Sequence, residues 1–210
     1  GNAAGCKAIE EATFAGVPIN VTLLFSGRHL VAAAEAWIRG IERRLTAGRE
    51  PRIPSVLSLF VSRWDVAVAK QVPPELHNKL GIAVAQQAYQ DYLALCATPR
   101  FRRLAEIGVP VQRLLWASTG TKDPKAPDTL YAEALYAPDT IDTLPEKTIH
   151  AFADHGRVGA PMARDGAAAA AVLERYRQAG VDIEALAERL QQEGKLAFDK
   201  AWRDLLAVID

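Results

Sequence analysis

The sequence predicts an α/β fold with a parallel sheet, and two observations carry that prediction. Short, apolar, β-branched runs indicate buried strands, and each is followed by long helical segments rich in Ala, Leu, Glu and Arg. Strands that alternate with helices at this spacing are typical of βαβ units, whose strands are parallel. Four such units are half of an eightfold (β/α)8 barrel. Because half a barrel has two open sheet edges, we expect other strands to complete it.

The chain is long enough for a substantial hydrophobic core and shows no internal repeat. It has 210 residues, half of them hydrophobic, which favours a single domain over residues 1–210. Lys plus Arg and Asp plus Glu number 25 each. With this balance the chain has no excess of positive charge to attract a nucleic acid, so we expect a small ligand.

The cysteines and histidines indicate which compartment and which cofactors to expect. Cys6 and Cys96 form no CxxC motif, which is typical of structural thiols in a reducing compartment. No apolar run approaches the roughly 20 residues of a membrane span, so we expect a cytoplasmic protein without a membrane partner. The four histidines show no metal-ligand spacing, and we expect surface or helix-end positions for them: His29, His77, His150 and His155. No metal or organic cofactor is predicted.

The first strand is predicted over residues 16–26, after a helix that ends near residue 15. Asn20 and Thr22 are its polar residues, and period-two alternation places them on one side with Val21 and Leu23 on the other. A strand can deliver polar side chains to a site in this way. The alternative is that Asn20 is a hydrogen-bonded core residue and Thr22 an ordinary strand residue.

A helix over residues 27–47 and a second strand over residues 55–63 follow. The polar residues of that strand are Ser58, Ser62 and Arg63. A buried arginine is costly unless it is paired, so Arg63 either meets a carboxylate such as Asp65 or binds an anion.

Helices are predicted next over residues 66–70, 79–97 and 99–107, with Tyr89, Tyr92 and Cys96 as packing residues. The third strand covers residues 111–118. The loop after it carries hydroxyls, Gly120 and Lys122, which suits an anion-binding loop, although a turn that happens to contain a lysine fits equally well.

The end of the chain is predicted to be mostly helical. A strand within residues 138–145 precedes a helix over residues 146–155. Three more helices, over residues 165–179, 183–193 and 195–209, are separated by glycines. We expect residues 157–210 to form a C-terminal helical extension.

Three motifs resemble the transaldolase family. The first has the form G-x-x-x-N-x-T-L-L-F-S and is matched by Gly16, Asn20, Thr22, Leu23, Leu24, Phe25 and Ser26. The second, S-x-F-V-x-R, is matched by Ser58, Phe60, Val61 and Arg63. The third, W-A-S-T-x-T-K-[DN]-P, runs from Trp116 to Pro124. The resemblance implies a TIM barrel of the class I aldolase type, of which this chain covers strands five to eight.

The resemblance also implies a reaction and roles for these residues. Transaldolases transfer a dihydroxyacetone unit between sugar phosphates of the pentose phosphate pathway through a lysine Schiff base. Asn20 and Ser58 would hold sugar hydroxyls, and Thr22 would orient the water or hydroxyl at the Schiff-base carbon. The remaining positions would form the pocket wall and the phosphate end: Phe60, Arg63, Ser118 and Lys122. Many relatives carry Arg near the seventh strand where this sequence offers Lys122, a point charge rather than a bidentate contact.

The Schiff-base lysine itself is not among these motifs. In the family it lies on a strand of the form K-[IV]-P-G, which implies a position about three residues upstream of Gly1. The expected partners are therefore sugar phosphates and the N-terminal half of the same barrel, and this chain alone is expected to be inactive. Lys122 is a poor substitute, because the neighbouring Asp123 stabilises the charged amine.

Two other functions remain open. The chain could belong to a transaldolase fused to a phosphoglucose isomerase, which this subgroup of sequences resembles. It could also be a non-catalytic fragment that binds sugar phosphates with Arg63 and Lys122.

Overall fold

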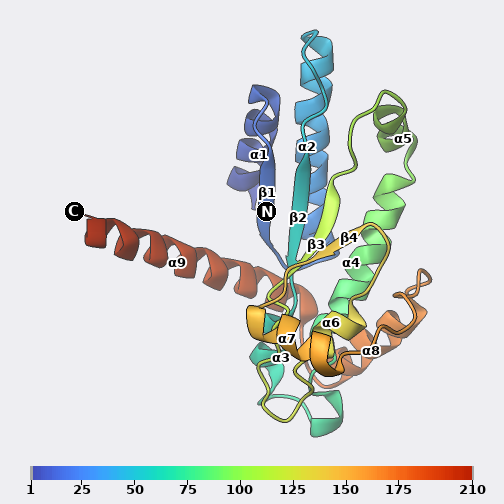
Figure 1. The fold of residues 1–210 in the computed structure, drawn as a ribbon, viewed down its shortest axis with the longest axis vertical. Coiled ribbons are helices and arrows are strands. Elements are labelled where there is room, and N and C mark those ends of the chain that lie inside the picture. Colours follow the sequence, from blue (N-terminus) through green and yellow to red (C-terminus); the bar gives the residue numbers. More distant parts are fainter. Residues whose placement is uncertain (1, 210) are drawn as a thin grey trace.

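The chain forms a four-stranded parallel sheet in the order β1-β2-β3-β4 (Figure 1). The computed structural model describes residues 2–209. The strands are β1 (Ile19–Leu24), β2 (Ser55–Phe60), β3 (Arg113–Ala117) and β4 (Thr140–Asp142). Because the spatial order follows the chain order, each strand pairs with the next after one helical crossover. The predicted α/β class with a parallel sheet is confirmed.

Helices precede, connect and follow the strands. Their bounds are α1 Ala3–Ala15, α2 Gly27–Thr46, α3 Ser62–Val68, the short 3₁₀ helix η1 Pro74–Leu76, α4 Leu80–Cys96, α5 Pro99–Glu106, α6 Leu130–Ala134, α7 Glu146–His155, α8 Ala167–Gln178 and α9 Ile183–Ile209. The predicted helices over residues 27–47, 79–97, 99–107 and 146–155 agree with α2, α4, α5 and α7 to within one residue at each end. Among the described residues, no helix has both the length and the hydrophobicity needed to cross a membrane.

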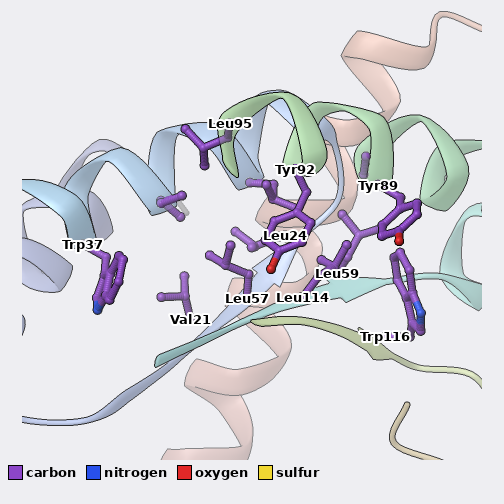
Figure 2. Close-up of a cluster of buried hydrophobic side chains, with 14 of the residues drawn as sticks. Val21, Leu24, Trp37, Leu57, Leu59, Tyr89, Tyr92, Leu95, Leu114 and Trp116 are labelled. Atoms are coloured by element: carbon purple, nitrogen blue, oxygen red, sulfur yellow. The ribbon is translucent and has the colours of Figure 1, made fainter. Parts of the chain in front are cut away.

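The main hydrophobic core lies between the sheet and the helices α2 and α4 (Figure 2). In β2 and β3 every second residue points into it, as the period of a strand requires, whereas β1 departs from this period after Val21. These residues meet Trp37 of α2 and Tyr89, Tyr92 and Leu95 of α4: Val21, Leu24, Leu57, Leu59, Leu114 and Trp116. Each large apolar side chain that is fully buried contributes roughly 1.5–3 kcal/mol. Tyr89 and Tyr92 are therefore packing residues, as predicted.

A second buried cluster joins α3, α4, α8 and the first part of α9. Its largest fully buried side chains are Phe25, Trp64 and Tyr176. Phe25 directly follows β1, so this cluster attaches the C-terminal helices beside the end of that strand.

The strand predicted over residues 55–63 is shorter than expected. Strand β2 ends at Phe60, and α3 begins at Ser62, so Arg63 lies in the first turn of a helix. The polar residues Ser62 and Arg63 therefore follow the strand instead of belonging to it. The apolar Val61, which lies between Phe60 and Ser62, hides this boundary in the sequence.

The predicted alternation along β1 is wrong at Leu23. Its φ of 58° lies in the left-handed region, which leucine rarely adopts. In the ladder with β2, Val21 pairs with Leu57 but Leu24 pairs with Leu59, so β1 contains a bulge. Leu24 joins Val21 in the main core, whereas Leu23 packs against the second cluster.

The C-terminal region also differs from the prediction. Residues 157–166 are not helical, and α9 continues without interruption through Gly194, where two helices were expected. A glycine costs a helix only about 1 kcal/mol relative to alanine, and strong helix formers flank this one. The last part of α9 extends away from the rest of the chain (Figure 1) and exposes apolar side chains.

His29 is not a surface residue. It is only 5% exposed, at the start of α2 beneath α9. The helix-end part of the expectation for His29 is correct, because it occupies the first turn.

Candidate functional site

Asn20 and Ser58 meet at the centre of the candidate site. They lie on the neighbouring parallel strands β1 and β2, and the Ser58 hydroxyl donates a hydrogen bond of 2.6 Å to the Asn20 side-chain oxygen. Ser58 is 2% exposed, whereas Asn20 is exposed. The bond occupies the oxygen of the Asn20 amide, and its two N–H donors have no partner among the described residues. The pair can therefore present donors to a bound hydroxyl.

Thr22 lies two residues beyond Asn20, directly before the bulge at Leu23. Its side chain is half-buried, and within the described part of the chain its hydroxyl makes no hydrogen bond. A hydroxyl in this state can both donate to and accept from a ligand.

Ser118 is paired with a residue that the sequence analysis did not assign to the site. The backbone N–H of Ser62 donates to the Ser118 carbonyl at 2.9 Å, and the two hydroxyls are 2.8 Å apart. Ser118 has a φ of 57°, which turns the chain out of β3. Ser62 occupies the second variable position of the S-x-F-V-x-R motif. Its place directly before Arg63 was the one sequence feature that could have assigned it to the site.

Arg63 lies over the ring of Phe60, with 5.2 Å between its guanidinium carbon and the ring centroid. Phe60 in turn packs against Phe25, with 5.5 Å between ring centroids. The Arg63 side chain is half-buried, and among residues 2–209 no carboxylate forms an ion pair with it. A guanidinium in this state suits an anionic ligand.

Asp65 does not pair with Arg63, so the ion-pair alternative is wrong. Its carboxylate accepts hydrogen bonds from the backbone N–H groups of Leu80 at 2.9 Å and Gly81 at 3.2 Å, and from the Tyr131 hydroxyl at 2.8 Å. Burial nevertheless raises the pKa of Asp65. These contacts join α3 to the start of α4, which is a structural role.

Lys122 is exposed and lines a cavity of about 690 Å³ between α3 and the loop after β3. Lys70 and Lys125 line the same cavity. No hydrogen bond or ion pair of Lys122 is found among the described residues, and no contact joins it to Arg63 or Ser118. The next residue, Asp123, accepts a hydrogen bond of 2.8 Å from the Asn78 amide, which ties the loop to the residues before α4.

Asp142, at the end of β4, is a half-buried carboxylate that the sequence analysis did not single out. Burial raises its pKa from 3.8 to about 6, and its Oδ1 atom has no hydrogen-bond partner among the described residues. The nearby loop after β3 is held by a hydrogen bond of 2.7 Å from the Thr119 hydroxyl to the Thr143 carbonyl.

The structure thus brings some predicted residues together, whereas the side chains of Thr22 and Lys122 make no hydrogen bond or ion pair with the others among the described residues. Asn20 with Ser58 and Phe60 with Arg63 are in contact, and Ser118 is joined to the residue before Arg63. Lys122 is not joined to any of them. In the part of the chain that the structure describes, no group of three His, Cys, Asp or Glu side chains could hold a metal ion.

Comparison with known proteins identifies the family. The family model described as transaldolase/fructose-6-phosphate aldolase matches residues 1–209. Proteins named transaldolase are 41% identical in Neisseria meningitidis serogroup A over 97% of this chain, and 43% identical in a Parafrankia species over 98% of it. Both alignments cover 58% of the relative, so the chain spans less than two thirds of the length of these proteins. The chain belongs to the transaldolase/fructose-6-phosphate aldolase family.

Proposed function

We propose that this chain forms the second half of the barrel of a transaldolase, which transfers a dihydroxyacetone unit from a ketose phosphate to an aldose phosphate. One observation carries the proposal: polar side chains lie on the neighbouring strands β1 and β2 and in the segment that directly follows β2. Asn20 is bound to Ser58, and the Thr22 hydroxyl and the Arg63 guanidinium have no hydrogen-bond or ion-pair partner among residues 2–209. The relatives named transaldolase support the same reaction.

The proposed chemistry uses a lysine Schiff base. The amine attacks the ketone carbonyl and water is lost, and the resulting iminium accepts the electron pair of the adjacent carbon–carbon bond as that bond breaks. An aldose phosphate leaves, and the enamine that remains attacks the aldehyde carbon of the acceptor. Water then hydrolyses the new iminium and frees the amine. The lysine and the carboxylates that move the protons would come from residues upstream of Gly1.

Asn20, Ser58 and Thr22 would act around the reacting carbon. The free N–H groups of Asn20 would hold a sugar hydroxyl, with Ser58 fixing the amide through its hydrogen bond of 2.6 Å. Thr22 would orient the water that is lost and regained at the Schiff-base carbon, because its hydroxyl makes no hydrogen bond within residues 2–209.

Arg63 would bind the phosphate of the substrate. Its guanidinium is half-buried over Phe60, which would form a wall of the pocket. Ser118, held by Ser62, would add a hydroxyl to the phosphate end. Lys122 would contribute at longer range, as an exposed cation on the loop that follows Ser118.

The first four strands would come from the N-terminal half of the same barrel, with this chain as strands five to eight. The relatives are long enough to supply that half, because the alignments cover only 58% of their length. The end of α9 exposes apolar side chains that a further layer of structure could bury: Leu196, Phe198, Trp202 and Leu205.

Two further expectations belong to this proposal. Residues 1–210 would form one domain, with residues 157–210 as its C-terminal helical extension. A cytoplasmic location would suit an enzyme that acts on sugar phosphates.

The proposal is tested by trapping the intermediate. The chain, alone and with the upstream residues of its reading frame, is incubated with fructose 6-phosphate and borohydride, and intact masses are measured. The expected result is a reduced three-carbon adduct only on the longer polypeptide, at the upstream lysine. The length of the same reading frame beyond residue 210 shows whether an isomerase domain follows.

Two results would contradict the proposal. A longer polypeptide that binds sugar phosphate but never forms an adduct would favour non-catalytic binding. An adduct on the 210-residue chain itself would place the reactive lysine within these residues.

A further inference from the structure

We infer that α9 clamps the bulge of β1 and thereby positions Thr22, with Gln191 as the positioning residue. This inference rests on the proposed function of Thr22. The clamp is defined here as Glu188, Gln191 and Gly194 of α9 together with His29 of α2.

The bulge is a strained element that needs external support. Leu23 has a φ of 58°, and the pairing between β1 and β2 shifts between Val21 and Leu24. A leucine in this region persists only where its surroundings hold it, and such bulges re-aim neighbouring side chains next to active sites. This bulge sets the orientation of the Thr22 side chain, because Thr22 directly precedes Leu23.

Gln191 supplies that support from a distant part of the sequence. Its side-chain amide donates a hydrogen bond of 2.9 Å to the Leu23 carbonyl, and the same nitrogen lies 3.3 Å from Nδ1 of His29. Gln191 is only 8% exposed. An amide nitrogen has two hydrogens, so it can satisfy both acceptors at once.

His29 completes the clamp through its two ring nitrogens. Nδ1 also accepts a hydrogen bond of 3.4 Å from the backbone N–H of Phe25, and Nε2 lies 3.0 Å from a carboxylate oxygen of Glu188. Because Nδ1 faces only N–H donors, the neutral ring carries its proton on Nε2 and donates it to Glu188. The ring therefore connects Phe25, which directly follows β1, to Glu188 of α9.

Gly194 permits the close approach of α9. A Cβ atom at this position would lie 2.9 Å from Cδ2 of Leu23 and 3.4 Å from a guanidinium nitrogen of Arg63. One turn of α9 therefore lies against both the bulge beside Thr22 and Arg63, the residue proposed to bind phosphate.

The first test replaces Gln191 in the polypeptide that contains this chain and its upstream residues. Gln191→Met keeps the length of the side chain but removes both donors, and Gln192→Leu changes the exposed neighbour as a matched control. For Gln191→Met we expect kcat to fall roughly 10- to 100-fold with little change in KM, and Gln192→Leu should match the wild type. A lower Tm with unchanged kcat of the folded fraction would overturn the inference.

The second test uses Gly194→Ala, whose methyl group would lie against Leu23. A purely structural role of α9 predicts that the folded fraction of this variant keeps full activity, whatever the change in Tm. The clamp predicts a lower kcat and a higher KM for the sugar phosphate, because the new methyl group displaces Leu23 and crowds Arg63. Full activity in this variant would contradict the contact with the site.

Hydrogen exchange separates failure of the clamp from failure of the proposed function. Exchange of the peptide that covers residues 19–25 should be faster in Gln191→Met than in Gln192→Leu, whether or not the protein is a transaldolase. If that exchange is unchanged, the clamp is wrong. If exchange changes but the wild type shows no transaldolase activity, the clamp holds the bulge and the role of Thr22 is wrong.

Discussion

On the face of the sheet that α2 and α4 cover, β2 presents Leu57 and Leu59, both 0% exposed. On the opposite face the same strand presents Ser58 and Phe60, next to Asn20 of β1. One strand therefore carries packing residues and proposed site residues in strict alternation. Substitutions of the packing residues should therefore lower stability, and substitutions of the site residues next to them in the sequence should lower activity.

The largest effect is expected on the packed face, at Trp116. This side chain is 0% exposed and contacts Tyr89 edge to face, with 6.5 Å between ring centroids. Trp116→Ala should lower the free energy of unfolding by about 3–5 kcal/mol, because it leaves a large cavity. Urea unfolding measures the loss, and Ile149→Ala, at an exposed position, serves as control. A loss below about 1 kcal/mol would show that the core is more adaptable than its packing suggests.

The next effect is expected at the site, at Arg63. Arg63→Met should reduce kcat/KM for fructose 6-phosphate about 100-fold, or about 2.7 kcal/mol, with little change in stability. Arg63→Lys should restore part of the activity, because a point charge replaces a bidentate contact. Arg102→Met, at an exposed position on α5, is the matched control. Equal losses for unphosphorylated and phosphorylated substrates would argue against phosphate binding.

Asp142 is an exception to the apolar character of the packed face. It pairs in register with the buried Trp116, yet its side chain is a carboxylate. Its pKa in the folded state is about 6, above its ordinary 3.8, so the folded state binds the proton more tightly. The resulting stabilisation is present at pH below about 4 and is lost as the pH rises through 6. Asp142→Asn should therefore be more stable than the wild type at pH 7, by at most about 3 kcal/mol.

The advantage of Asp142→Asn should disappear near pH 4, where the wild-type carboxyl group is neutral. Urea unfolding at pH 4, 5.5 and 7 checks this. A difference between the two proteins that stays constant with pH would mean that Asp142 does not titrate in this range.

The smallest effect is expected for the hydrogen bond between Ser58 and Asn20. A double-mutant cycle with Ser58→Ala and Asn20→Ala should give a coupling energy of about 1 kcal/mol in kcat/KM. Ser55→Ala is the control, because the Ser55 hydroxyl donates to the Ile19 carbonyl instead. Its effect should be additive with that of Asn20→Ala. Full additivity for the Ser58 pair would mean that the two side chains act independently.

The sequence by itself determined the layers of this protein. The bounds of α2, α4, α5 and α7 and the parallel order of the strands follow from apolar periodicity and from the alternation of strands and helices. The adjacency of Asn20 and Ser58 was also within reach, since both are polar residues on consecutive strands. These features depend on neighbours that are close along the chain, so local pattern suffices to predict them.

Only the tertiary structure decided the left-handed conformation of Leu23, the partners of Asp65 and the burial of His29. Each depends on residues far along the chain: Gln191 contacts Leu23 across 168 positions, and Tyr131 contacts Asp65 across 66. The continuity of α9 through Gly194 has the same origin, because the glycine that looks like a stop permits close packing against Leu23. A single sequence specifies its local periods, but contacts between distant residues arise only when the packed elements meet.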